Sequence, residues 1–513
     1  MLALVNSCAL MGVDGYPLTV EVDVSPGIAR FDIVGLPDAA VKESRERVRA
    51  ALRNSGFEFP LRRLTVNLAP ANIRKEGSVL DLPIAVGILA ATGQLSCDES
   101  FLRQGVFVGE LSLEGAVRPI SGALSMAACV ARQGLSSFFL PAANAKEAAI
   151  AQGVQVYGVE ELRQLTEQLS GDALCSPVTV DVQALFRQSL NKEEELDMAD
   201  VKGQEGVKRA LTVAAAGGHN VLMIGPPGSG KTMLAKRMPG LLPPLSLEES
   251  IEATKLYSVS GLLPKDQPLL TVRPFRAPHH GASAASIIGG GANPRPGEIS
   301  LASHGILFMD ELPEFSRDVL EALRQPLEER RVTVARVNAR VNYPADFQLI
   351  AAMNPCPCGY YGDGLKECTC TPYARERYMQ RLSGPLLDRI DLHISVPRTE
   401  YRQLSGKEKS VSSAELRRQV TAAREIQAKR FPGKASPLNA SMTRRELEQF
   451  CRCDRQASVL LEQAFRMLKM SARAHDRILK VARTIADLDG AEQIGQAHIA
   501  EAIQYRSLDR KEV

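Results

Sequence analysis

The hydrophobic positions of the chain follow different periods in different places, and the changes divide it into regions. Up to about residue 170, β-branched apolar runs alternate with runs of helical period. The strand-like runs cover residues 1–13, 18–24, 28–34, 64–68, 107–111 and 137–140, and the helical runs cover 38–54 and 82–91. This alternation predicts an α/β or α+β domain.

Between about residues 199 and 400, short and mostly apolar runs replace the alternating ones. Three of them, at residues 220–224, 306–309 and 347–353, are typical of buried strands in a doubly wound parallel sheet. After residue 400 the period is helical, over residues 411–430, 443–450, 455–468, 475–488 and 491–503. We therefore expect an α/β core followed by an all-helical domain.

Polar stretches mark the boundaries. Ser176-Pro177 and Asn191–Glu195 interrupt the periodicity between the first two regions. The predicted organisation is a first domain at 1–170, a linker at 171–198, an α/β core at 199–400 and a helical domain at 401–513.

Composition narrows the functional classes. A net charge of +3 over 513 residues means that any contact with nucleic acid must come from local basic loops. No apolar run reaches the roughly 18 residues of a membrane span, and Met1–Val13 lacks the basic start of a signal peptide. The ten cysteines are too sparse for a disulfide scaffold, which indicates a reducing, cytoplasmic location without membrane contact.

The candidate chemistry centres on an octapeptide between a predicted strand and a predicted helix. It fits G-x-x-x-x-G-K-[ST], the P-loop, with the residues Gly225, Pro226, Pro227, Gly228, Ser229, Gly230, Lys231 and Thr232. The glycines let backbone N–H groups close around phosphates, and Lys231 supplies a positive charge for the same oxygens. Because the Thr232 hydroxyl can ligate Mg²⁺, the sequence predicts a site for ATP and Mg²⁺.

Two later strands end in polar side chains suited to that site. The apolar run 306–309 is followed by Asp310, which suits the Mg²⁺ shell, and Glu311, which suits a base that polarises water. The run 347–353 is followed by Asn354, whose amide can bind the γ-phosphate or orient the attacking water. A doubly wound sheet would bring these strand ends next to the P-loop.

Two other groups could bind a metal. Four thiols that suit a tetrahedral structural Zn²⁺ site lie in a glycine-rich loop, at Cys356, Cys358, Cys368 and Cys370. Free thiols are the alternative, because C-x-C spacing is less specific than C-x-x-C; a lone C-x-C at Cys451–Cys453 is expected to be helical and structural. His279-His280 lacks carboxylate partners at helical spacing, so loop packing is the better interpretation.

The order of these motifs resembles the AAA+ ATPases. The resemblance implies that the arginine of the segment 382–391, Arg389, reaches the nucleotide site of a neighbouring subunit in a homo-hexamer. Arg381, one residue before that segment, is the second choice. A structural ion pair with Asp388 or Asp391 is the alternative for Arg389. In the helical lid, the resemblance implies γ-phosphate contact by Arg473, with Arg477 as runner-up.

Two insertions are similar to those of the magnesium-chelatase-like branch of AAA+. One covers residues 275–300, and the other, residues 331–343, predicts a β-hairpin. In that branch such hairpins project into the ring pore, so Arg336 and Arg340 are candidates for contact with DNA. Alternatively, these arginines only solvate the hairpin edge.

The region around residues 75–144 resembles the Lon-protease fold, but it departs from the protease pattern. The serine of the Ser–Lys dyad falls on Val79 and the lysine falls near Leu124. Neither side chain can do nucleophilic catalysis, although Ser78 and Ser125 are adjacent. We expect a Lon-like (S5-type) α+β domain without the dyad, serving a structural, partner-binding or DNA-binding role.

The chain as a whole resembles the YifB/ComM family of magnesium-chelatase-like AAA+ ATPases. The resemblance implies a hexameric ring motor on single-stranded or branched DNA, with a helicase-type branch-migration activity in recombination during natural transformation. A metal-insertion ATPase is the alternative, although no dedicated acidic metal-binding domain is evident in the 513 residues. An ATP-dependent protease is a second alternative, which the missing dyad disfavours.

Overall fold

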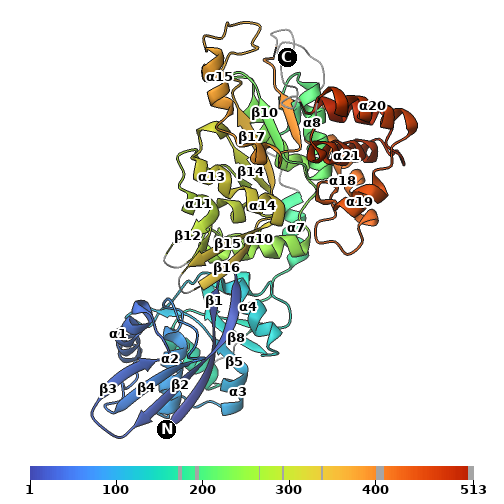
Figure 1. Ribbon diagram of the computed structural model, residues 1–513. Helices are drawn as coiled ribbons and strands as arrows, with labels where there is room; N and C mark the ends of the chain where they lie inside the picture. The colour runs from blue at the N-terminus through green and yellow to red at the C-terminus, as the bar shows by residue number, and fades with distance from the viewer. Residues whose placement is uncertain are drawn as a thin grey trace. The chain divides into compact units, whose positions relative to one another are not determined.

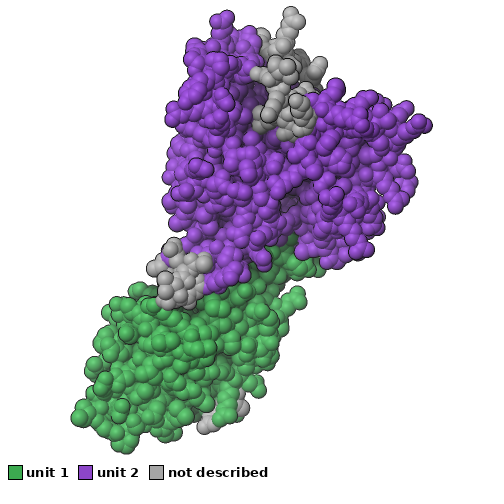
Figure 2. Space-filling model, in the orientation of Figure 1, with its two compact units in different colours: residues 1–191, 247–271 green, residues 192–246, 272–513 purple. Residues whose placement is uncertain are grey.

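The computed structural model describes residues 1–171, 176–190, 196–264, 266–291, 294–336, 339–399, 410–468 and 470–506. The chain forms two compact units (Figures 1 and 2). Unit 1 comprises residues 1–191 and 247–271, and unit 2 comprises residues 192–246 and 272–513. Among the described helices, none has the length and apolarity needed to cross a bilayer.

A seven-stranded mixed sheet forms the framework of unit 1, in the order β3-β4-β2-β1-β5-β8-β9. Its strands are β1 (Leu2–Met11), β2 (Asp14–Ser25), β3 (Arg30–Val34), β4 (Arg63–Ala69), β5 (Gly105–Phe107), β8 (Ser137–Pro141) and β9 (Gln155–Val159). Strands β1, β2 and β4 pair antiparallel, and β5, β8 and β9 continue parallel to β1. The edge strand β3 pairs only with β4, in parallel, among the described strands.

The central helix of unit 1 is α2 (Asp81–Ala91), which is buried at every position except Ala90. A helix that is apolar all round needs cover on all sides, and α1 (Ala39–Asn54) provides part of it. Arg47 of α1 donates from Nε to the buried Asp81 carboxylate at 2.7 Å. The remaining short elements are α3 (Glu99–Gln104), β6 (Glu110–Leu111), β7 (Val117–Arg118), α4 (Ala123–Arg132), α5 (Ala142–Ala148), α6 (Leu162–Leu169) and α7 (Val182–Leu190). Helix α7 lies inside the predicted linker.

Helix α10 (Leu247–Val259) belongs to unit 1, although the chain on both sides of residues 247–271 belongs to unit 2. Its Ser258 Oγ accepts from the Gly122 N–H at 2.8 Å and donates to Glu147 at 2.5 Å. Glu147 also accepts from the Leu124 N–H at 2.8 Å, and burial raises the pKa of its carboxyl. Residues 247–271 are therefore held in unit 1 by a buried polar contact as well as by the apolar packing of Leu269.

Unit 2 contains a five-stranded parallel sheet in the order β11-β14-β17-β10-β18. Its strands are β10 (Val221–Ile224), β11 (Phe275–Arg276), β14 (Ile306–Met309), β17 (Gln348–Met353) and β18 (Leu392–Ser395). Strands β14 and β17 are buried at every position, as the apolar runs predicted. Because all strands are parallel, the chain leaves β10, β14 and β17 at the same edge of the sheet.

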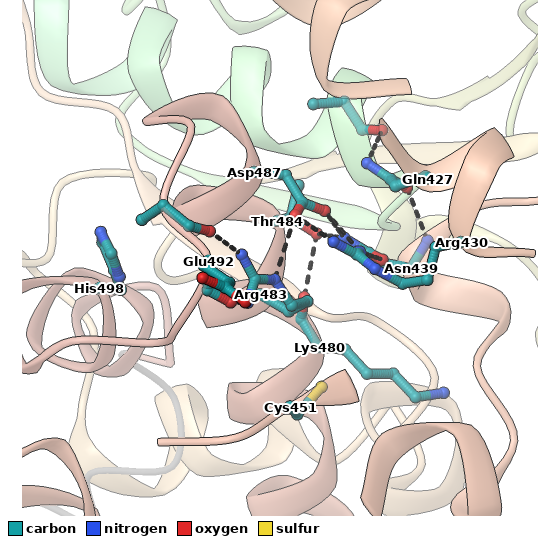
Figure 3. Close-up of polar contacts among 12 residues, drawn as sticks. Gln427, Arg430, Asn439, Cys451, Lys480, Arg483, Thr484, Asp487, Glu492 and His498 are labelled. Carbon is teal, nitrogen blue, oxygen red and sulfur yellow. Dashed lines mark hydrogen bonds and ion pairs between the residues drawn. The ribbon is translucent and has the colours of Figure 1, made fainter. Parts of the chain in front are cut away.

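Five α-helices of the described chain follow residue 410, coloured orange to red in Figure 1. They are α18 (Ser413–Arg430), α19 (Arg444–Phe450), α20 (Arg455–Met467), α21 (Ala472–Leu488) and α22 (Gln496–Gln504). Two of them, α18 and α21, pack against α8 (Glu205–Gly217). At the centre of this lid, the buried Asp487 accepts from Arg430 at 2.6 Å and from Arg483 at 3.1 Å (Figure 3). Asn439 donates to the same carboxylate at 2.8 Å.

The helical predictions for residues 451–453 and 491–495 are wrong. Cys453 pairs with Ile494 in an isolated parallel bridge, which draws both segments out of helical geometry. Helix α20 begins only after Asp454, whose side chain caps it through the Ala457 N–H at 2.7 Å. Helix α22 likewise begins after Gly495, its N-cap residue.

Candidate functional site

The P-loop joins the end of β10 to the start of α9 (Lys231–Arg237). Gly228 and Gly230 have φ values of 79° and 87°, a region that L side chains rarely adopt. A Cβ atom on Gly225 would lie 2.2 Å from the Val396 carbonyl oxygen. The glycines predicted from the motif are thus required by the backbone of the loop.

Lys231 lies inside this loop and is 8% exposed. Its Nζ donates to the carbonyl oxygens of Gly225 at 2.7 Å and Pro226 at 2.9 Å, and lies 3.4 Å from Asn354 Oδ1. Burial lowers the pKa of Lys231, while the carboxylates of Asp310 and Glu311 oppose that shift. The geometry brings Asn354 at the end of β17 to the lysine.

The acidic pair follows β14 directly. Thr232 Oγ1 donates to Asp310 Oδ2 at 2.8 Å, so the two predicted Mg²⁺ ligands lie side by side. Hard oxygen donors of this kind, a hydroxyl and a carboxylate, are the ligands that Mg²⁺ takes in nucleotide sites. Both carboxylates are accessible, since Asp310 is half-buried and Glu311 is exposed.

Glu311 has a left-handed backbone, with φ of 53°, and its N–H donates to Asp310 Oδ1 at 3.0 Å. This conformation is costly for a residue with a side chain, and such strain is concentrated at functional sites. His280 lies with Nδ1 at 3.5 Å from Glu311 Oε2. The expectation that His279-His280 serves only loop packing therefore missed a contact with the proposed base.

Gln204 is a second residue that the sequence did not assign to the site. Its Nε2 donates to the Ser229 carbonyl at 2.8 Å and to Thr399 Oγ1 and the Pro397 carbonyl, both at 3.2 Å. Gln204 too has a left-handed backbone, with φ of 59°. It therefore ties the P-loop to the segment that follows β18. Only its position just before α8 could have drawn attention to it.

Three family descriptions together match most of the chain. "Magnesium chelatase, subunit ChlI" matches residues 197–404, "Subunit ChlI of Mg-chelatase" matches 20–144, and the ChlI C-terminal description matches 410–506. Competence protein ComM of Haemophilus influenzae is 45% identical over 512 residues, which cover 99% of this chain and 98% of that protein. YifB of Escherichia coli is 44% identical with the same coverage. This chain belongs to the YifB/ComM family of magnesium-chelatase-like ATPases.

Membership confirms the predicted fold class, an AAA+ P-loop core with a helical lid behind a Lon-like domain, and it identifies an ATPase that uses ATP and Mg²⁺. Lon protease 2 of Bacillus subtilis is 25% identical over 209 residues, or 37% of this chain.

In this YifB/ComM-family chain, the positions of the protease dyad hold apolar side chains. Val79 is half-buried in the unit 1 cores and Leu124 is 1% exposed. The neighbouring Ser78 hydroxyl donates to Glu110, and Ser125 is buried. No lysine contacts either hydroxyl in the described part of unit 1, so the geometry offers no Ser–Lys dyad.

The predicted arginines are held by acidic partners within the chain. Arg389 is 12% exposed at its side chain and forms an ion pair with Glu328. Arg381 is 52% exposed and pairs with Glu314 at 2.8 Å. Among the described contacts, neither arginine touches the P-loop, Asp310 or Glu311.

The two lid arginines, like Arg389 and Arg381, each have an acidic partner and differ in the exposure of their side chains. Arg473 is 68% exposed and lies 3.4 Å from Asp388, whereas Arg477 is 16% exposed and lies 3.2 Å from Asp391. His219, just before β10, donates from Nδ1 to the Asp391 carboxylate at 3.0 Å, and its Nε2 forms a hydrogen bond with Thr484 Oγ1 of α21 at 2.8 Å. Burial tends to raise the pKa of Asp391, but His219 and Arg477 overcome this and hold it at about 2. Asp391 thus anchors the lid to the core as an anion.

The four cysteines of the loop after β17 converge. Their sulfur atoms all lie within 4.8 Å of one another, and the Cys356–Cys358 and Cys356–Cys368 separations are 3.3 and 3.6 Å. The N–H of Tyr360 is the main cause that lowers the pKa of Cys358, to about 5. Residues twelve positions apart are brought together as ligands of a single ion would be.

The predicted hairpin is confirmed as β15 (Arg331–Arg336) and β16 (Ala339–Pro344). Arg340 is exposed and faces Ala335 across the pair. Arg336 ends β15, and its side chain lies outside the described residues, as do residues 337 and 338 at the turn. The buried Tyr343 donates to the Pro294 carbonyl at 2.7 Å, which ties the hairpin to the other insertion, where β12 (Gly289–Gly290) pairs with β13 (Arg295–Pro296).

Proposed function

We propose that this ATPase works on DNA as a homo-hexameric ring and drives branch migration in homologous recombination, in the cytoplasm of cells that take up DNA. The observation that carries the proposal is the hairpin β15–β16 with its exposed Arg340. It lies in the chain between the two strands, β14 and β17, that end in Asp310 and Asn354. A change at the nucleotide site can therefore be passed to a basic hairpin through the elements that flank it. The relative from Haemophilus influenzae is named a competence protein, which supports this task.

The described residues divide the work at the nucleotide. The backbone of Gly225–Thr232 and the Lys231 side chain bind phosphate oxygens. Thr232 and Asp310 together bind Mg²⁺. When bound, Mg²⁺ neutralises charge that develops on the phosphates. Glu311 accepts a hydrogen bond from the attacking water and polarises it. Asn354 orients that water or the γ-phosphate.

The arginines complete the site in this proposal. Arg389 exchanges its ion pair with Glu328 for the nucleotide of the neighbouring subunit, and Arg381 is the alternative because it is the more exposed of the two. Arg473 reaches the γ-phosphate from the lid, since its partner Asp388 is only weakly engaged at 3.4 Å. Arg477 is committed to Asp391 and serves the lid–core contact.

Replacing Arg340 with alanine is expected to leave basal ATP hydrolysis unchanged but to weaken its stimulation by branched DNA about tenfold, because a phosphate contact is lost. The assay is ATP-dependent branch migration of a synthetic four-way junction, with ATPase rates measured in the same buffer. Arg444→Ala, which removes an 83% exposed charge from the lid, is the matched control. If the parent protein neither binds DNA nor responds to it, the motor proposal is excluded. Native mass in that buffer tests the ring.

A metal-insertion ATPase is the second candidate, favoured by the chelatase descriptions that match the chain. It requires partner subunits that hold the tetrapyrrole. ATPase activity that ignores DNA but changes on addition of a chelatase partner would support it instead of the motor.

We also propose that Cys356, Cys358, Cys368 and Cys370 bind one structural Zn²⁺. At Zn–S distances of about 2.3 Å, a tetrahedron separates its sulfurs by about 3.8 Å. The three separations among Cys356, Cys358 and Cys368 are 3.3–3.6 Å, and all four sulfurs lie within 4.8 Å of one another. The loop follows Asn354, so the ion would stabilise the chain beside the nucleotide site. Free thiols remain the alternative.

Replacing Cys368 and Cys370 with serine is expected to remove about one zinc per chain and to lower the midpoint of thermal unfolding, because metal binding stabilises only the folded state. Elemental analysis of protein purified without chelator provides the measurement. Cys453→Ser, in the C-x-C that lacks a second described pair, should keep its zinc. Parent protein without zinc would contradict the proposal.

A further inference from the structure

A groove on unit 1 is not used by any function considered so far. It consists of two adjoining cavities of about 310 and 730 Å³, and both are lined by the segment Phe59–Arg62. The first also contacts β3 and α1, and the second continues along Arg53 and Phe57. This segment therefore lies where the two hollows adjoin, beside the edge strand β3, and is shared by both.

The arginines of helix α1 lie on two sides of the helix, one toward the interior of unit 1 and the other toward this groove. Arg47 faces inward to the buried Asp81, whereas Arg45, Arg49 and Arg53 are exposed at successive i, i+4 positions on another side of the helix. Like charges at i, i+4 destabilise a helix. No ion pair with an acidic side chain offsets this for Arg49 or Arg53 within the described chain. Among the residues of α1 that line the two cavities, three positive charges thus stand against the one negative charge of Glu46, which favours an anionic ligand.

The same groove offers aromatic and apolar surface. The half-buried rings of Phe31 and Phe59 lie 5.8 Å apart, and the Arg49 guanidinium lies 5.5 Å from the Phe59 ring centre. Leu61, in the segment that lines both cavities, is 77% exposed. Five arginines and three carboxylates line the two cavities, a net of +2, and one of those carboxylates, Asp32, is already paired with Arg30 at 2.8 Å.

A polyanion with flat, partly apolar side groups fits this combination better than an acidic peptide does. Arginine forks match phosphate geometry and stack on planar groups, and bases stack on exposed aromatic or apolar surface. We propose that the groove binds single-stranded nucleic acid, with the backbone along Arg45, Arg49 and Arg53 and bases against Phe59–Leu61. This contact goes beyond the motor function, since it belongs to unit 1 and needs neither ATP nor the hairpin β15–β16.

The test replaces Arg45, Arg49 and Arg53 with glutamine in the full-length protein. Binding of a fluorescein-labelled oligothymidine is measured by anisotropy, without nucleotide, over a range of salt. Three lost phosphate contacts should reduce the slope of log affinity against log salt by about 2, at about 0.7 per contact for single strands. If variant and parent bind equally at about 1 M salt, the variant should bind roughly a hundredfold more weakly than the parent at about 0.1 M.

The control replaces Arg132, Lys146 and Arg163, exposed cations of the same unit, with glutamine, so that the net charge changes equally. It should keep the parent slope; a matching loss in both variants would show a general charge effect and overturn the proposal. Photocrosslinking with an iodouracil-containing oligonucleotide should label residues 57–62, and Leu61→Ser, at an exposed position, should reduce that labelling. Labelling confined to the hairpin would overturn the groove site while leaving the motor intact.

Two competitors distinguish the ligand class. An abasic strand of equal length should bind at least about tenfold more weakly than oligothymidine if bases contact Phe59–Leu61. If a polyglutamate peptide displaces the oligonucleotide at equal charge concentration, the groove is an acidic-peptide site and the nucleic-acid proposal fails.

Discussion

A Glu311→Gln protein is expected to bind ATP and assemble like the parent but to hydrolyse it at least about a hundredfold more slowly. A positioned general base contributes roughly 10²–10⁴ in rate, and glutamine cannot accept the proton. The neighbouring geometry should survive, because the Glu311 backbone N–H still donates to Asp310 and Thr232 still donates to the same carboxylate. The loss should therefore fall on turnover and spare affinity.

The measurement pairs steady-state phosphate release with equilibrium binding of a fluorescent ATP analogue. Glu462→Gln, at a carboxylate on α20 that is 62% exposed, is the control for the charge change and should keep the parent rate. Turnover within about threefold of the parent would remove Glu311 from the role of base. If both binding and turnover disappear, the variant has damaged the Mg²⁺ site instead, and the assignment again fails.

The nucleotide site could be predicted from sequence to the extent that each part is local. Gly225–Thr232 and the Asp310-Glu311 pair follow short apolar strands, and parallel pairing alone places those strand ends together. His280 and Gln204 could not be found in this way. Their contacts join segments that are dozens of residues apart, and neither an adjacent pair of histidines without acidic partners nor a single glutamine indicates such a contact.

The assignment of α10 to unit 1 shows a second limit of prediction from sequence. It is a helix without a marked apolar face that lies in the chain between two elements of the core, and its contacts, such as the Ser258–Glu147 hydrogen bond, and the burial of Leu269 assign it to unit 1. The error at 451–453 has the same origin, because the bridge to Ile494 overrides the local helical period. The proposed role of Arg389 depends on a neighbouring subunit, and that of Arg473 depends on a bound nucleotide. The local sequence could therefore indicate these residues as candidates but could not identify the groups that they contact.

The lid depends on one buried carboxylate more than on any single apolar contact. Asp487 is 1% exposed at its side chain and accepts from Arg430 and Arg483, which are 12% and 2% exposed. Asn439 also donates to it, and Gln427 links Asn439 to the Ala216 carbonyl of α8 (Figure 3). Arg430 and Arg483 are thus both neutralised through this residue.

Asp487→Ala is expected to destabilise the lid by about 3–5 kcal/mol, because it leaves two buried guanidinium groups without their counterion. Urea unfolding followed by circular dichroism, with hydrogen exchange of α21 amides, measures the loss. Asp489→Ala, two residues on and 46% exposed, should cost less than about 1 kcal/mol. Since α21 also carries Arg473, Arg477 and the Thr484 contact to His219, loosening it should lower ATP hydrolysis as well. Stability within about 1 kcal/mol of the parent would mean that the two arginines find other acceptors, and that the lid is held chiefly by its apolar core.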